Sequence, residues 1–128
     1  MKLDGYTILI VDDDIDILES FELAMRAEGA TTRTATDGTE AVSVCQSAQP
    51  EIVILDMMLP KRSGFLVLEE FQRMEHPPIV VMVTANQGKR HMAYAKSLGV
   101  AGYLTKPVGL DRLIDTVSYL LNDSSKRS

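Results

Sequence analysis

The sequence contains almost no cysteine and no long hydrophobic run. Cys45 is the only cysteine, so the chain cannot form a disulfide within itself. It lies in the apolar segment AVSVCQSA, where a small buried hydrophobic side chain is a simpler interpretation than a reactive thiol. No apolar run approaches the roughly 20 residues that span a bilayer, so we expect no membrane contact. The beginning, MKLDGYT, lacks the apolar stretch of a secretory signal, and we therefore expect a cytoplasmic protein.

Positive charge is also scarce. The chain has 13 lysines and arginines against 18 aspartates and glutamates, a net charge of −5. This balance argues against direct nucleic acid binding by this chain. With 128 residues, 45% of them hydrophobic, the chain has the length and composition of one globular domain. We expect a single domain over residues 1–128, with a core from about 5 to 121 and a polar tail at 122–128.

Short apolar runs alternate with segments of helical period. Strands are expected at 6–11, 31–36, 51–55, 79–83 and 101–105, and helices at 14–28, 39–48, 64–74, 87–98 and 109–121. The second strand is the most polar, which places it near an edge of the sheet. Five successive strand–helix units predict an α/β fold: a doubly wound five-stranded parallel sheet with helices on both faces. The strand order 2-1-3-4-5 suits this length.

Four aspartates are crowded into the six residues of VDDDID, 11–16, where the first strand ends. Neighbouring carboxylates disfavour each other's ionisation unless a cation lies among them. An EF-hand calcium loop would require glycine and glutamate at positions where this chain has Ile17 and Leu23. A calcium site of the EF-hand class is therefore excluded. Glycine-rich phosphate-binding loops are absent too. A magnesium site and simple helix capping remain as explanations.

Polar residues follow each of the four predicted strands that read as buried. Asp12 and Asp13 follow the first strand, and Asp56 follows the third. Thr84 ends the fourth strand, and Lys106 follows the fifth. In a parallel sheet of this kind, ligands bind beyond the carboxyl ends of the strands. Three carboxylates, a hydroxyl and an ammonium group should therefore converge at one edge of the sheet.

Several short motifs stand in a fixed order along the chain, at the ends of predicted strands. They are Asp12-Asp13 after ILIV, Asp56 in LDMMLP, Gly64 eight residues later, Thr84-Ala85 after IVVMV, and Tyr103-Leu104-Thr105-Lys106-Pro107. Together they resemble the receiver domain of two-component response regulators. The resemblance covers residues 5 to about 121, and implies a single receiver domain with a flavodoxin-like fold of five strands and five helices.

The resemblance implies a role for each matching residue. Asp56 would be the nucleophile that accepts a phosphoryl group and forms an aspartyl phosphate. Asp12, Asp13 and Asp56 would hold one Mg²⁺, with the backbone carbonyl of Met58 as a further ligand. Lys106 would neutralise a phosphoryl oxygen.

Two further residues would form the switch. Thr84, together with the backbone N–H of Ala85, would hydrogen-bond a phosphoryl oxygen, and Tyr103 would be the aromatic side chain that rotates in response. The Lys106–Pro107 peptide bond would be cis. Met58 and Asn86, two residues after the phosphoacceptor and the switch threonine, would influence attack by water on the phosphoryl group.

The resemblance also implies partners. The phosphodonor would be a sensor histidine kinase or a histidine phosphotransfer protein. The output would be a domain or protein controlled through the surface of the fourth helix (about 87–98), the fifth strand and the fifth helix. A phosphorylation-dependent dimer stays open, as do the cognate kinase, the pathway and whether a longer regulator contains this chain.

Two rival functions leave sequence signatures that this chain does not match. A phosphatase using an aspartyl phosphate, as in the haloacid dehalogenase group, would need Thr or Val at Asp16 and a substrate-covering cap. A flavin-binding domain would need a Ser-, Thr- and Gly-rich loop after the first strand, where VDDDID would repel phosphate. We therefore expect a switch rather than an enzyme, with only self-phosphorylation from small donors and autodephosphorylation.

Other polar residues have simpler interpretations. Asp14 is expected to be a helix N-cap, and Asp16 a solvated charge in the first turn. Lys61 and Arg62 are most simply a solvated pair, with a role in partner docking as the alternative. His76 and His91 are expected at the surface. The scattered methionines are expected to lie in the core or to fill gaps in the packing: Met57, Met58, Met74, Met82 and Met92.

Overall fold

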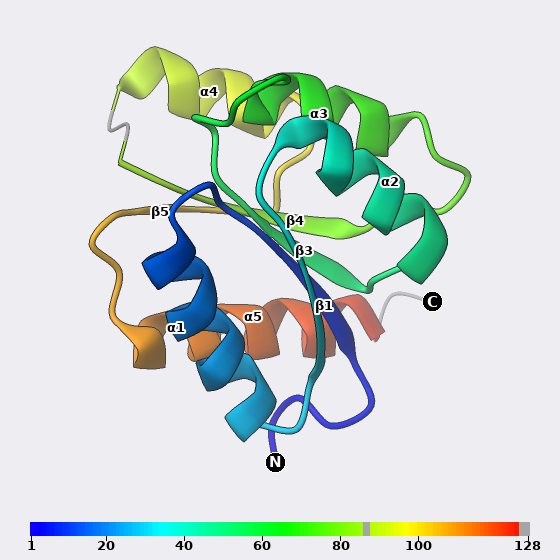
Figure 1. The fold of residues 1–128 in the computed structure, drawn as a ribbon, viewed down its shortest axis with the longest axis vertical. Helices are drawn as coiled ribbons and strands as arrows, with labels where there is room; N and C mark the ends of the chain where they lie inside the picture. The colour runs from blue at the N-terminus through cyan, green and yellow to red at the C-terminus, as the bar shows by residue number, and fades with distance from the viewer. Residues whose placement is uncertain (86–87, 126–128) are drawn as a thin grey trace.

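Five parallel strands form one sheet with helices on both faces (Figure 1). The computed structural model describes residues 1–85 and 88–125, with side chains described up to residue 123. The strands are β1 (Thr7–Val11), β2 (Thr31–Ala35), β3 (Ile52–Leu55), β4 (Ile79–Thr84) and β5 (Gly102–Thr105). Their order is β2-β1-β3-β4-β5, and every neighbouring pair is parallel. The predicted fold class and strand order are confirmed.

Five helices connect and follow the strands: α1 (Ile15–Ala27), α2 (Gly38–Ala48), α3 (Gly64–Gln72), α4 (Lys89–Ser97) and α5 (Leu110–Ser125). Helices α1 and α5 cover one face of the sheet, and α2, α3 and α4 cover the other (Figure 1). Each core layer lies between the sheet and one of these helix groups. The central strand β3 is buried along its whole length, whereas the edge strand β2 alternates between exposed and buried residues, as its polar sequence predicts.

The start of α1 is capped as its sequence predicts, whereas the end of α5 differs from the prediction. The side chain of Asp14 accepts hydrogen bonds from the backbone of Asp16 and Ile17, which confirms it as the N-cap of α1. Helix α5 continues to Ser125, so the prediction that it ends near 121 is wrong. No glycine or proline follows Leu121, so the sequence has no residue that would stop the helix there. Helix α4 begins at Lys89, and the predicted start at 87 lies outside the described residues.

The core contains the residues that the apolar pattern assigns to it. Cys45 is buried in the layer beneath α2, as predicted, and so are Met57 and Met82. Met58 is different: its side chain is 64% exposed, so the expectation that it fills the core is wrong. The reason is that Met58 lies in the loop after β3, beyond the end of the sheet.

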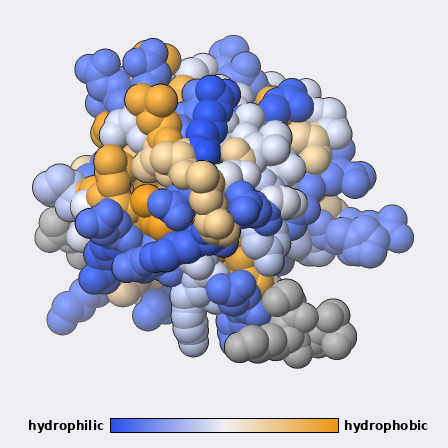
Figure 2. Space-filling view, turned by 90° about the horizontal axis from the view of Figure 1, so that it is seen from below, coloured by the Kyte–Doolittle hydropathy of each residue, from blue (hydrophilic) through white to orange (hydrophobic). Residues whose placement is uncertain are grey.

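The surface is largely hydrophilic on the side of α1, α5 and the N-terminus. Figure 2 views the molecule from this side and shows hydrophilic residues over most of it, with hydrophobic residues gathered in a smaller area. Across the described part of the chain, the large exposed hydrophobic residues are Met1, Ile15, Leu23, Met58, Leu66, Tyr94, Leu110 and Tyr119. No helix in the described ranges is long and apolar enough to cross a membrane.

Candidate functional site

Three carboxylates meet at the carboxyl ends of β1 and β3. The pairing of Val11 with Leu55 places the residues that follow them, Asp12 and Asp56, side by side. Both are buried, at 2% and 5% exposure, whereas Asp13 is exposed. One carboxylate oxygen from each of the three lies within 4.8 Å of the others. The prediction that these strand ends bring the three aspartates together is confirmed.

Lys106 reaches the same cluster from the loop after β5. Its Nζ atom lies 2.7 Å from Oδ2 of Asp12 and 3.3 Å from Oδ2 of Asp56, and its side chain is 17% exposed. The backbone N–H of Lys106 donates to the carbonyl of Thr84 at 2.9 Å, which ties this loop to the end of β4. The Lys106–Pro107 bond is cis, as the resemblance implies. The single ammonium group of Lys106 balances only part of the negative charge of the three carboxylates.

The buried position of the cluster shifts the pKa of both Asp12 and Lys106. Burial raises the pKa of Asp12, an effect that the hydrogen bond from Lys106 reduces and the charge of Asp56 reinforces. For Lys106, burial alone would lower the pKa, but its hydrogen bond to Asp12 and the charges of Asp56 and Asp12 outweigh this and raise it. The lysine thus stays charged, and the ionised form of Asp12 would gain from a further cation.

The donor set of this cluster fits a hard divalent cation. All three side chains offer oxygen, the ligand atom that Mg²⁺ prefers, and the exposed Asp13 leaves a side open to water. Backbone groups orient the two buried carboxylates: the N–H of Asp14 donates to Asp12 at 2.9 Å, and the N–H of Met58 donates to Asp56 at 3.3 Å. These bonds leave the second oxygen of each carboxylate facing Lys106.

The predicted switch residues lie on the two strands beside the cluster. Thr84 is fully buried at the end of β4, between β3 and β5, and Ala85 follows it at the surface. Tyr103 on β5 is half-buried and packs against the core layer beneath α2, α3 and α4. Burial raises the pKa of Tyr103, and the negative charge of Asp56 adds to the effect. Asn86 lies outside the described residues, and the roles of these residues remain predictions.

The loop after β3, residues 57–63, makes contacts that sequence reasoning missed. Lys61 has a positive φ of 67° and lies 3.5 Å from Oδ2 of Asp37, so the expectation of a simple solvated pair with Arg62 is incomplete. The backbone N–H of Gly38 donates to the carbonyl of Pro60 at 3.2 Å. The only signal in the sequence was the Asp37-Gly38 turn that precedes α2, which does not reveal its partner.

An aromatic cluster joins α3 to α4. The ring of His91 stacks on Phe65 with centroids 5.9 Å apart, and the ring of Tyr94 meets Phe65 edge-on at 5.0 Å. The hydroxyl of Tyr94 donates to Glu69 at 3.1 Å. Both His91 and His76 are exposed, as predicted for surface residues. These contacts lie at the surface of α4, whose only buried residue is Ala95.

Comparison with models of protein families identifies one family that matches most of the chain. The family model described as the response regulator receiver domain matches residues 8–118. A curated relative, the probable transcriptional regulatory protein TcrX of Mycobacterium tuberculosis, is 34% identical over 116 residues. The match covers 90% of this chain and 49% of the relative, so the chain spans about half the length of that protein.

Solved structures agree with this assignment. A CheY-like response regulator receiver domain protein from Methanospirillum hungatei JF-1 has a TM-score of 0.92 at 25% identity, covering 98% of this chain and 99% of the other. The chemotaxis response regulator CheY4 of Vibrio cholerae has a TM-score of 0.82 at 26% identity, covering 89% and 97%. The receiver domain of the Francisella response regulator 1452 has a TM-score of 0.88 at 25% identity, covering 94% and 99%.

Proposed function

Because this chain belongs to the response regulator receiver domain family, we propose that it is a signalling switch that accepts a phosphoryl group on Asp56. The observation that carries the proposal is the cluster at the sheet edge: three carboxylates within 4.8 Å of one another and one lysine in contact with two of them. Asp56 is the carboxylate best suited to be the nucleophile, because it follows the central strand β3 and so lies between Asp12, which follows β1, and Thr84, which ends β4. Lys106 is in contact with it as well.

The proposed metal is Mg²⁺, held by Asp12, Asp13 and Asp56, with the backbone carbonyl of Met58 as a fourth protein ligand. When bound, it would shield the charge of these carboxylates from that of the incoming phosphoryl oxygens. The metal roles of these residues are consistent with their all-oxygen donor set and with the open side at Asp13.

The remaining groups would position and stabilise the phosphoryl group. A carboxylate oxygen of Asp56 attacks phosphorus, an O–P bond forms, and the bond from phosphorus to the donor's leaving group breaks. Lys106 would then move from the carboxylates to a phosphoryl oxygen. The Thr84 hydroxyl and the Ala85 N–H would donate to another. This is transfer by positioning and charge stabilisation, which is what phosphoryl transfer mainly requires.

The alternative of an aspartyl-phosphate phosphatase has no support. Family membership identifies a signalling domain, and in the described residues the fold is a single sheet with four connecting helices and a fifth after the last strand. We propose that the donor is a sensor histidine kinase or a histidine phosphotransfer protein, and that the phosphorylated domain controls an output domain or protein.

The test of the phosphoacceptor is direct. Incubation with acetyl phosphate and Mg²⁺ should add one phosphoryl group to the intact mass of the wild-type protein, and none to Asp56→Asn. The matched control is Glu75→Gln, which removes an exposed carboxylate before the amino end of β4 and should be phosphorylated like wild type. Equal phosphorylation of Asp56→Asn would show that the acceptor is another residue.

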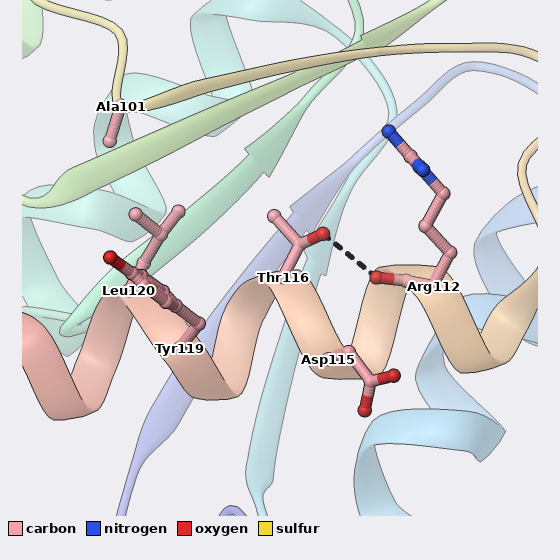
Figure 3. Close-up of a pocket in the computed structure, with 6 residues that line it drawn as sticks. All are labelled: Ala101, Arg112, Asp115, Thr116, Tyr119 and Leu120. Carbon is pink, nitrogen blue, oxygen red and sulfur yellow. Dashed lines mark hydrogen bonds between the residues drawn. The ribbon is translucent and has the colours of Figure 1, made fainter.

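We propose that the output surface is formed by α4, β5 and α5. Helix α4 buries only Ala95, so few packed contacts hold it in place, which suits an element that shifts. The face of α5 near the start of β5 has an open hollow of about 600 Å³, with Tyr119 and Leu120 at one end and Arg112 at the other (Figure 3). Ala101, Asp115 and Thr116 complete its lining.

Phosphorylation would act on this surface through Thr84 and Tyr103. Movement of the Thr84 hydroxyl toward the phosphoryl group would make room for the Tyr103 ring to turn inward, favouring a state already present at low population. Beryllofluoride with Mg²⁺, a phosphoryl mimic, should then perturb amide signals along α4 and β5. Changes confined to Asp12, Asp13 and Asp56 and their neighbours would contradict this route.

A further inference from the structure

The loop of residues 57–63 is held at its outer end by the N-terminus of α2. The N–H of Gly38 donates to the carbonyl of Pro60 at 3.2 Å. Next to it, Asp37 caps α2 by accepting from the N–H of Glu40 at 2.8 Å, and its other oxygen lies 3.5 Å from Nζ of Lys61. The Asp37-Gly38 turn therefore joins two segments that follow different strands of the sheet.

Only glycine leaves enough room for this contact. A Cβ atom built on Gly38 would lie 2.4 Å from the backbone oxygen of Arg62 and 2.5 Å from its Cβ. The backbone of Arg62 could not move aside without moving the loop. Alanine is otherwise the better residue inside a helix, so the close approach of the loop accounts for glycine at this position.

The inner end of the same loop is held by separate contacts. The N–H of Gly64 donates to the carbonyl of Met57 at 2.7 Å. The N–H of Met58 donates to Oδ1 of Asp56 at 3.3 Å. Met58 thus lies between two attachment points, the start of α3 on one side and the Gly38–Pro60 hydrogen bond on the other. The position of its carbonyl depends on both.

We propose that Gly38 is a positioning residue for metal binding, because its contact with Pro60 and Arg62 holds the loop that presents the Met58 carbonyl. This inference rests on the proposed function, in which that carbonyl is a metal ligand. Gly38 itself touches no ligand; it acts through the loop. A loop that is ordered before the metal arrives loses less conformational freedom on binding, and the affinity is higher as a result.

The variant Gly38→Ala tests the inference. Its Cβ must push the loop away from α2. Loss of the groups that hold metal ligands directly lowers metal affinity by about 10- to 100-fold, and the lower end of that range applies because Gly38 acts one step further away. We expect the Mg²⁺ concentration at half-maximal phosphorylation by acetyl phosphate to rise about tenfold, with a rate close to wild type at saturating Mg²⁺. A Mg²⁺ titration followed by the amide signal of Met58 should show the same shift.

A control separates positioning from general loss of stability. Gly99 has a φ of 91°, and a Cβ there would lie 3.0 Å from the side chain of Gln72, so Gly99→Ala is strained in a different part of the fold. It should lower the melting temperature and leave the Mg²⁺ requirement unchanged. An equal rise in Mg²⁺ requirement for Gly99→Ala and Gly38→Ala would overturn the inference.

A second variant covers the case in which Gly38→Ala does not fold. Pro60→Gly keeps the carbonyl but frees the loop backbone, and it should also raise the Mg²⁺ requirement. A folded variant of either kind with a requirement within about twofold of wild type would refute the positioning role. Failure of the wild-type protein itself to bind Mg²⁺ or accept a phosphoryl group would instead refute the proposed function, and this inference with it.

Discussion

Replacing Asp13 with asparagine should make the metal-free protein more stable. The carboxylate oxygens of Asp12, Asp13 and Asp56 lie within 4.8 Å of one another, and Lys106 contacts only the two buried ones. Two unit charges at that distance repel by about 1 kcal/mol in water. Because Asp13 is exposed, this lower limit applies rather than the larger value for buried pairs. Asp13→Asn removes two such repulsions and no contact with the lysine.

The expected gain is about 1 kcal/mol, since salt and the charge of Lys106 offset part of the two repulsions. For a domain of this size, that gain corresponds to a rise in melting temperature of roughly 3–5 °C. Added Mg²⁺ should reduce the difference in melting temperature between Asp13→Asn and wild type. It should stabilise the wild-type protein by binding to the folded state and stabilise Asp13→Asn much less. The two melting temperatures should therefore converge or cross as Mg²⁺ increases.

Thermal unfolding followed by circular dichroism, with EDTA and over a series of Mg²⁺ concentrations, measures both effects. Glu75→Gln provides the control for loss of one exposed negative charge, and should change neither the metal-free melting temperature nor its response to Mg²⁺. A metal-free Asp13→Asn protein that is less stable than wild type, and still gains stability from Mg²⁺, would refute the reasoning. It would mean that Asp13 has a capping or structural role.

Three other changes test separate parts of the structure. Met58→Asn should shorten the lifetime of the phosphoryl group, measured by the decay of intact mass, because an exposed amide can hydrogen-bond water where a thioether cannot donate. Leu3→Ala should lower the free energy of unfolding in urea by about 2–5 kcal/mol, because Leu3 is fully buried against the α1 and α5 layer. Burial raises the pKa of the Cys45 thiol to about 11. The unfolded chain therefore loses this proton at lower pH than the folded one. The contribution of the protonated Cys45 thiol to the free energy of unfolding is fully present below about pH 9 and is lost as the pH rises toward 11. The urea midpoint should accordingly fall more between these pH values for wild type than for Cys45→Ala, and an equal fall would contradict the assignment.

The fold class, the strand order and the composition of the site could all be predicted from the amino-acid sequence. Apolar runs and helical periods alternate clearly, and a parallel sheet necessarily brings the residues after its strands to one edge. This is why the amino-acid sequence already groups Asp12, Asp13, Asp56 and Lys106 at one site. The N-cap role of Asp14 was equally accessible, because capping depends only on residues within one turn.

How the loops meet depends on packing between segments that are distant in the sequence. The contact of Gly38 with Pro60 and Arg62 joins segments more than twenty residues apart, and it exists because α2 packs beside α3. Nothing in the local sequence of either segment encodes that distance. The exposure of Met58 has the same origin, because an apolar residue in a loop is buried only if another element covers it. Local chemistry thus supplied the carboxylates and the lysine of the site, and packing between distant segments supplied their support.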